Sequence, residues 1–251
     1  VEEIEKEKEE TEEDFVDKYD FGEDWTETKE KNSGKGSKAS IVVSGLTGTN
    51  NARSPRNANL MKRPTPSRAP AVTGVRQSST TSTFGVPVSV GLGAKIRFTD
   101  RWSLGVGVNY SYLTRKFYGT YTEVDSEGNI DYSESADFRN NQHFIGIPVN
   151  AYFNIIANDR INFYTYAGGA VERCVADKYV MLGKDFTYSA KPKGVQWSVN
   201  VGLGVEFMLG KTVGIYLDPS LRYYFNCGQP SSIRTEQPLM LAFEAGLRFK
   251  I

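Results

Sequence analysis

The sequence lacks several features from which a function is usually argued. No apolar run approaches the roughly 20 residues of a membrane-spanning helix. The start of the chain also lacks the basic and apolar segments of a signal peptide, so we expect a mature chain or a part of a longer one. The only histidine, His143, is expected at a loop edge in solvent, and no acidic segment has the spacing of a calcium loop. We therefore predict no enzymatic activity, no metal and no cofactor.

Glycine and aromatic residues are abundant instead, with 24 Gly, 14 Tyr and 14 Phe, a composition typical of all-β proteins. In residues 84–98, "FGVPVSVGLGAKIRF", apolar side chains alternate with small or charged ones. This period of two predicts a β-strand with one apolar face. The pattern recurs along the chain, and we predict eight strands, at residues 39–48, 84–98, 102–112, 144–155, 161–174, 195–209, 213–226 and 239–251.

The volume of a small barrel indicates which face of these strands points inward. The interior of an eight-stranded barrel is only just wide enough for side chains to fill it, so it cannot hold the large apolar residues of every strand. The small and polar residues fit that interior, and the apolar residues then face lipid. We predict an all-β, eight-stranded, antiparallel up-and-down transmembrane β-barrel, although 24% charged residues and zero net charge alone suggest a soluble protein.

Charged residues of both signs fall on the predicted inward face. We expect them to pair and to plug the lumen, because buried charges persist only when paired; a gated pore or a pH-sensitive switch is the alternative. These lumen charges are Lys95, Arg97, Glu172, Glu206, Asp218, Arg222, Glu244, Arg248 and Lys250. Aromatic residues near the strand ends predict girdles at the two lipid interfaces, formed by Phe98, Trp102, Tyr110, Tyr112, Trp197, Phe207, Tyr223, Phe225 and Phe249.

Short and long connections alternate, as periplasmic turns and extracellular loops do in outer-membrane barrels. Residues 99–101, 157–160 and 210–212 are predicted tight turns, and residues 124–141, 182–194 and 227–237 are predicted polar loops. Residues 49–83 are expected to form a long, basic, irregular first loop. Residues 1–37 are dominated by Glu, Asp and Lys and are predicted to be a disordered acidic periplasmic linker. The barrel domain then covers residues 38–251.

Four stretches, "GIPVNAYFN", "FYTYAGGAVERCV", "IYLDPSLRYYF" and "SSIRTEQPLMLAFEAGLRF", resemble recurring motifs of the small outer-membrane β-barrel domain of Bacteroidetes. The resemblance covers residues 39–251 and is strongest from residue 84. It implies a place in the cell outer membrane, with the N-terminal segment in the periplasm, and contact with outer-membrane lipid and the barrel assembly machinery. Some such barrels resemble the C-terminal part of dual-membrane-spanning anti-sigma-factor-like proteins, and the acidic N-terminal segment is similar to their linker.

We predict a non-enzymatic outer-membrane anchor or envelope sensor, the barrel part of a longer trans-envelope regulator. Its extracellular loops are expected to contact envelope proteins or ligands, and no nucleic-acid partner is expected. The alternatives are a narrow gated pore or a lipid-binding or ligand-binding small barrel, and a soluble calycin-like ligand-binding barrel. Cys174 and Cys227 both fall near the predicted extracellular rim, where a disulfide between them and two free thiols are the open alternatives.

Overall fold

The computed structural model describes residues 39–48, 54–55, 72–192 and 194–251. The predicted linker of residues 1–37 and most of the first loop lie outside these residues. The described chain is nearly all β-structure. Its elements are β1 (Ala39–Gly48), β2 (Ser54–Pro55), β3 (Gly74–Phe84), β4 (Val88–Arg97), β5 (Trp102–Val124), β6 (Ile130–Ala157), β7 (Ile161–Met181), β8 (Thr187–Ala190), β9 (Val195–Met208), β10 (Val213–Tyr224), α2 (Ile233–Glu236) and β11 (Leu239–Lys250).

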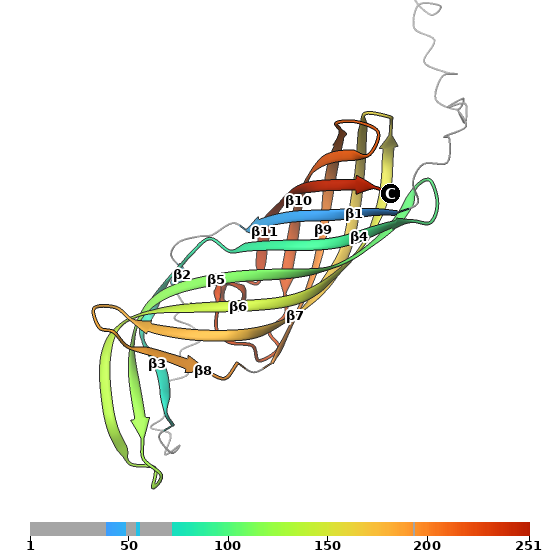
Figure 1. Ribbon diagram of the computed structural model, residues 1–251. Coiled ribbons are helices and arrows are strands. Elements are labelled where there is room, and N and C mark those ends of the chain that lie inside the picture. The colour runs from blue at the N-terminus through green and yellow to red at the C-terminus, as the bar shows by residue number, and fades with distance from the viewer. Residues whose placement is uncertain (1–38, 49–53, 56–71, 193) are drawn as a thin grey trace, which may run out of the picture. The chain divides into compact units, whose positions relative to one another are not determined.

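Eight of these strands pair side by side into a closed ring. The order around the ring is β5, β4, β1, β11, β10, β9, β7 and β6, and β6 pairs again with β5. Every pairing is antiparallel. The first strand, β1, pairs with the last strand, β11, from Ser40↔Lys250 to Gly48↔Ala242. The ring therefore has no open edge (Figure 1). The predicted eight-stranded antiparallel barrel is confirmed.

The alternation along each strand places the apolar side chains outside the ring. On β4, Leu92 is 63% exposed whereas Lys95 is 9% exposed, and on β9, Trp197 is 54% exposed whereas Gln196 is 1% exposed. Successive residues point to opposite faces of a strand, so the same division holds along its length. An outer surface made of so many exposed Val, Leu, Ile and aromatic side chains is stable in lipid, not in water. This arrangement contradicts the calycin-like alternative, which needs the apolar face inside.

Facing glycines let β4 and β5 approach closely. Gly93 pairs with Gly107 across the two strands, and both lie on the inward-facing side. A Cβ atom on Gly107 would lie 2.6 Å from the carbonyl oxygen of Leu92, closer than a side-chain carbon can come. Glycine permits this approach, and the missing side chains leave space on this side of the lumen.

Strands β5, β6 and β7 continue far beyond the ring on one side. They have 23, 28 and 21 residues, whereas about 10 residues suffice to cross a membrane and β4 has 10. Three predictions were wrong here: residues 130–141 and 187–190, expected in loops, belong to β6 and β8, and residues 74–83, expected in the first loop, belong to β3. The apolar and polar alternation that identifies a strand in lipid is lost where the strand leaves lipid.

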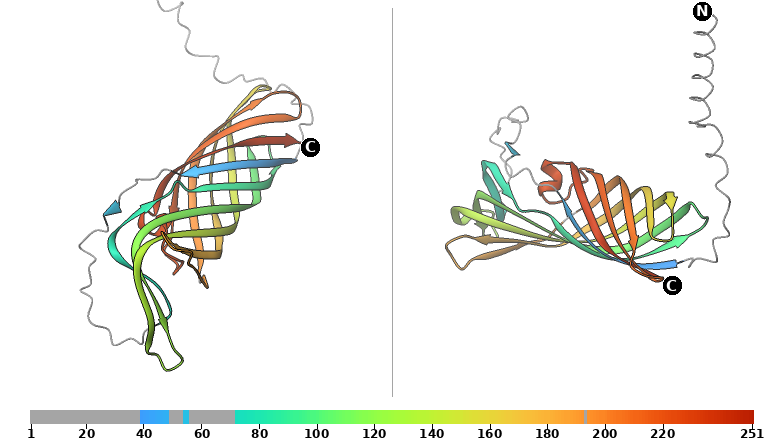
Figure 2. Two further views of the ribbon diagram at one scale, coloured as in Figure 1. Left: turned by 60° about the vertical axis from the view of Figure 1, so that its left-hand side comes forward. Right: turned by 90° about the horizontal axis from the view of Figure 1, so that it is seen from above.

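The extension, which we define as β3, β8 and the parts of β5–β7 beyond the ring, is a packed sheet. β3 pairs with β5, and β8 pairs with β7. The Tyr188 hydroxyl of β8 donates to the Thr73 carbonyl, just before β3, over 3.4 Å, so the sheet curls until its outer strands meet. Its inner face carries a buried cluster of Phe117, Tyr121, Phe138 and Met181. Both views of Figure 2 show the long strands projecting from the ring.

The opposite end of the ring, which we name the short-turn end, has tight connections. Residues 98–101, 158–160 and 209–212 join β4 to β5, β6 to β7 and β9 to β10, which confirms the three predicted turns. α2 lies in the connection between β10 and β11, at the other end of the ring, which we name the long-strand end. Within the described residues, no helix is long and apolar enough to cross a membrane.

Candidate functional site in the barrel interior

The predicted lumen charges do face the interior. Lys95, Glu172, Glu206, Asp218, Arg222 and Arg248 are buried, and Arg97, Glu244 and Lys250 are half-buried. Part of the expected pairing is present, because Arg248 Nη1 lies 2.5 Å from Glu206 Oε2. The partner of Glu172, however, is Arg234, which the sequence analysis did not select.

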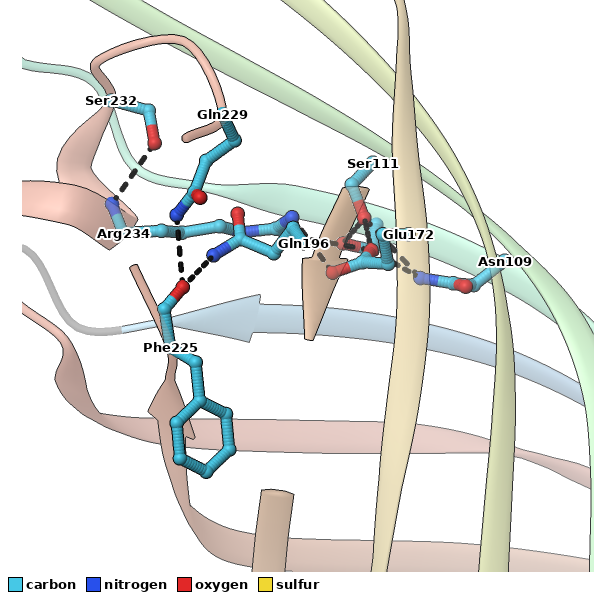
Figure 3. Close-up of polar contacts among 9 residues, drawn as sticks. Asn109, Ser111, Glu172, Gln196, Phe225, Gln229, Ser232 and Arg234 are labelled. Atoms are coloured by element: carbon cyan, nitrogen blue, oxygen red, sulfur yellow. Dashed lines mark hydrogen bonds and ion pairs between the residues drawn. The ribbon is translucent and has the colours of Figure 1, made fainter. Parts of the chain in front are cut away.

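Glu172 on β7 and Arg234 on α2 form the best-defined polar contact in the lumen. Each residue is 1% exposed. Arg234 Nη1 lies 2.8 Å from Glu172 Oε2, and Arg234 Nη2 lies 3.4 Å from Oε1. Asn109 Nδ2 and Ser111 Oγ of β5 donate to Oε1 over 2.8 and 3.0 Å (Figure 3). A two-point pair with further donors is the geometry that best offsets the desolvation of buried charges, and here it ties α2 to the barrel wall.

The local sequence explains why Arg234 reaches the interior. Ser232 Oγ accepts a hydrogen bond from the Arg234 amide, and Thr235 Oγ1 accepts one from the Ser232 amide. This reciprocal capping starts the short helix. Its first turn directs the Arg234 guanidinium over the rings of Phe144 and Tyr224, 5.1 and 4.7 Å from their centroids, where cation–π attraction adds to the ion pair.

The strand that precedes this connection is fixed by two amide side chains. Gln229 Nε2 and Gln196 Nε2 both donate to the carbonyl oxygen of Phe225, over 3.0 and 3.5 Å (Figure 3). The connection from β10 to β11 therefore follows a defined path into the end of the barrel.

An apolar layer closes the lumen on the long-strand side of this ion pair. Leu113 and Cys174 stand two residues further along β5 and β7 than Ser111 and Glu172, so they form the next level of the interior. The whole layer consists of Phe84, Leu113, Phe144, Cys174, Tyr224, Ile233 and Met240. Packed apolar side chains disfavour water and ions, so we expect this layer to seal the lumen at this end.

A second polar layer lies where β5, β6 and β7 leave the ring. Asp177 is 4% exposed, and Asn140 Nδ2 and Gln142 Nε2 donate to its Oδ1 over 2.5 and 3.4 Å. The Tyr179 hydroxyl donates to Oδ2 over 3.3 Å, and Arg115 Nε donates to Asn140 Oδ1 over 3.3 Å. Burial, followed by the Asp177 charge, raises the pKa of Tyr179 to about 12, so this hydroxyl remains a donor at neutral pH. The layer joins the three long strands at the base of the extension.

Tyrosines fill the lumen toward the short-turn end. The ring centroids of Tyr152, Tyr164 and Tyr166 lie 5.4 to 6.5 Å apart. The Tyr164 hydroxyl donates to Asp218 Oδ1 over 2.6 Å and accepts from Arg248 Nη2 over 3.3 Å. Aromatic rings as well as ion pairs therefore occupy this part of the interior.

Two cavities remain, one beside the glycine-lined wall of β4 and β5 and one at the short-turn end. The first encloses about 70 Å³ and is lined by this wall, Asn109, Arg222 and Glu244, among others. The second encloses about 40 Å³ at the short-turn end, and Lys95 lines both. Roughly 10–15 Å³ measured in this way holds one water molecule, so each cavity has room for several waters or for a small polyatomic ion.

The residues of the predicted aromatic girdles lie on the outer face, and all but one of them are exposed. Phe98, Trp102, Tyr110, Trp197, Phe207, Tyr223, Phe225 and Phe249 are exposed there. Tyr112 is half-buried because its ring packs 5.2 Å from the ring of His143. His143 lies within β6, not at a loop edge as predicted, and its Nδ1 shares a hydrogen bond of 2.5 Å with the Tyr110 hydroxyl.

The two cysteines are free thiols. Of the two alternatives left open by the sequence, the structure therefore has the free thiols and not the disulfide. Cys174 is buried in the apolar layer, and Cys227 is exposed in the connection from β10 to β11. Among the residues that the structure describes, no three His, Cys, Asp or Glu side chains are grouped so that they could hold a metal ion.

Sequence reasoning missed Arg234, Arg115 and Asp177. The capping pattern of Ser232 and Thr235 was available as a signal for a helix at Arg234. Arg115 continues the inward alternation of β5, so a longer strand would have included it. Asp177 could not be placed from alternation, because an irregularity between the His143 and Phe144 pairings shifts which residues of β7 face inward.

Comparison with known proteins gives a family match and several similar structures. A family model described as outer membrane protein beta-barrel domain matches residues 43–229. Neisserial surface protein A is 13% identical, with 85% of this chain and 99% of that chain covered and a TM-score of 0.42. A major outer membrane protein from Thermus thermophilus is 10% identical, with 85% and 99% covered and a TM-score of 0.43. Outer membrane protein OprG from Pseudomonas aeruginosa is 10% identical, with 87% and 98% covered and a TM-score of 0.41. No curated protein matches the chain.

Proposed function

Because this chain belongs to the outer membrane protein beta-barrel domain family, we propose that it is a non-enzymatic outer-membrane anchor that displays a rigid β-sheet at the cell surface for recognition of envelope or extracellular partners. The observation that carries the proposal is the extension, a sheet with its own buried cluster on one end of a sealed barrel. An anchor needs no open lumen, and a displayed sheet needs support from the membrane-embedded strands. The apolar layer and the buried cluster of the extension support both conditions.

The length of the strands supports display outside the membrane. A strand rises about 3.3 Å per residue, so the 28 residues of β6 reach ~90 Å if straight, against a hydrocarbon core of ~30 Å. The surface of the extension carries exposed Tyr118, Ile130 and Tyr132 among polar residues. Aromatic side chains with polar groups around them are enriched at recognition surfaces.

The alternation of short and long connections supports an orientation with the extension outside the cell. Small outer-membrane barrels keep short turns in the periplasm and longer loops outside. β1 begins at the short-turn end, where Ala39 pairs with Ile96 of β4. In this orientation the N-terminal segment leads into the periplasm.

The finer assignment to a longer trans-envelope regulator of the anti-sigma-factor-like kind is part of the same proposal. Its support is the resemblance of the quoted motifs to Bacteroidetes barrels and the acidic composition of residues 1–37. A segment in the periplasm could then report occupancy of the extension to partners there.

Cysteine labelling of whole cells tests the display. In a Cys227→Ser background, Glu127→Cys places a thiol at the tip of the β5–β6 hairpin, and Lys211→Cys places one in a short turn. A membrane-impermeant maleimide is expected to label Glu127→Cys in intact cells and Lys211→Cys only after the outer membrane is permeabilised. The reverse pattern would overturn the orientation and the display function with it.

Conductance in planar bilayers separates the anchor from the narrow-pore alternative. The apolar layer and the Glu172–Arg234 pair predict no conductance steps from the folded protein. Reproducible ohmic steps that disappear on heat denaturation would favour a pore instead.

A further inference from the structure

We propose that the short-turn mouth of the lumen binds a small oxyanion of the phosphate class, held by Lys95, Arg97 and Lys250. The inference is independent of the display function, since it concerns the other end of the barrel. It starts from the charges of the mouth cavity, whose lining is Ala39, Ser40, Lys95, Arg97, Ser103, Asn154, Asn162, Glu206, Arg248 and Lys250.

The lining of this cavity has an excess of positive charge. Its only carboxylate among the described residues is that of Glu206, which is paired with Arg248. The positive charges of Lys95, Arg97 and Lys250 are left over in a cavity of about 40 Å³. Charges confined by low-dielectric walls act on a ligand more strongly than the same charges on an open surface, so the cavity favours an anion.

Lys95 is the strongest evidence that a counter-ion belongs here. It is 9% exposed, and its Nζ lies over the rings of Tyr152 and Tyr164, 4.2 and 4.5 Å from their centroids. The structure shows no carboxylate of the described residues within ion-pair distance of this ammonium group.

The carboxylates that share the lumen with Lys95 bind other side chains. Glu206 binds Arg248, Asp218 accepts from Tyr164, and Glu244 accepts from Tyr216 over 2.9 Å. A buried ammonium group without a counter-ion is costly. An oxyanion in the adjoining cavity would give this ammonium group a counter-ion at contact distance, which Asp218 and Glu244, bound to neutral tyrosine hydroxyls, do not provide.

The rest of the mouth suits a phosphate-sized ligand. Ser103 and Asn162 line the cavity with a hydroxyl and an amide group, which can donate to the remaining oxygens. Arg97 brings a planar guanidinium that matches two oxygens of a phosphate. Arg97 and Lys250 are half-buried, so they reach solvent and leave an entrance, whereas the other end of the lumen is sealed by the apolar layer.

Titration of inorganic phosphate into the full chain, folded in a zwitterionic detergent at constant ionic strength, tests the proposal by calorimetry. Saturable binding is expected, with affinity reduced at least tenfold in Arg97→Gln/Lys250→Gln and in Lys95→Met. The matched control is Arg101→Gln/Lys211→Gln, which removes two exposed cations from short turns at the same end but outside the cavity, and it should bind as the unchanged protein does. Each variant is first shown to be folded by its unboiled gel mobility.

The site would be overturned if the folded unchanged protein showed no saturable binding of phosphate. It would also be overturned if the control variant lost as much affinity, because phosphate would then be attracted by the general positive charge of this surface. A phosphate ester of lipid shares this chemistry, and vesicles distinguish the two sources. If the natural source is a lipid headgroup, phosphatidylglycerol vesicles will abolish binding of free phosphate while phosphatidylcholine vesicles preserve it. If the source is free phosphate, both vesicles will preserve binding.

Discussion

Single residues in this lumen differ in how their charge is compensated. Glu172 receives hydrogen bonds from Arg234, Asn109 and Ser111, so its charge is balanced within bonding distance. The ammonium group of Lys95 lies against the rings of Tyr152 and Tyr164, and no carboxylate of the described residues is within ion-pair distance of it. The first arrangement is complete without a ligand and serves structure, whereas the second leaves a place for an anion in contact with the ammonium group.

The Glu172–Arg234 pair allows a prediction at the residue scale. Glu172→Leu leaves Arg234 as a buried unpaired cation and should lower the free energy of unfolding by about 3–5 kcal/mol. Urea unfolding in lipid vesicles, followed by tryptophan fluorescence, measures this change. Glu172→Leu/Arg234→Leu removes both charges and should recover most of the loss; a double variant as unstable as the single one would show that the pair itself is not the cause.

At the scale of elements, the β5–β6 hairpin shows how a long strand pair is ended outside the membrane. Asp125 Oδ1 accepts hydrogen bonds from the amides of Glu127 and Asn129, each over 2.9 Å. Gly128 has a φ of +87°, a conformation that glycine adopts without strain. The tip of the hairpin is therefore a defined turn in which one carboxylate satisfies backbone donors.

This turn predicts a pH dependence. The Asn129 amide, and then the Glu127 amide, hold the pKa of Asp125 below its ordinary value. A lowered folded-state pKa means that the carboxylate stabilises the turn above the ordinary pKa of about 3.9, and that this contribution disappears as the pH falls through the lower folded value.

Amide chemical shifts of Glu127 and Asn129, followed by NMR during acid titration, are the measurement. They should titrate together at a pH below that of a free aspartate, and the transition should be absent in Asp125→Ala. A midpoint at or above the free-aspartate value would contradict the turn.

For the whole molecule, the apolar outer surface and the polar interior require lipid or detergent for folding. We predict that the unboiled protein migrates faster than the boiled protein on a denaturing gel only after refolding in detergent or lipid, because a closed barrel resists unfolding by the gel detergent. A monomer that is folded without any detergent would mean that the apolar face is not in contact with lipid.

The membrane-embedded part could be predicted well, and the rest could not. Lys95, Asp218 and Arg248 were assigned to the lumen correctly because strict alternation in strands next to lipid leaves no choice of face. Residues 130–141 and 74–83 were missed because strands in water carry polar residues on the outer face and lose that pattern. Arg234 was missed because its position depends on a connection folding back into the barrel.

The sequence by itself determined the eight ring strands and which of their faces meets lipid, since a period of two and the limited volume of a small barrel permit one solution. Only the tertiary structure decided which charges are paired, where the lumen is sealed, and that three strands continue into a sheet with its own core. Those features depend on residues far apart in the chain, such as Glu172 with Arg234 and Phe117 with Met181. Local alternation carries no information about such pairings, because they arise when the ring closes and brings distant strands together.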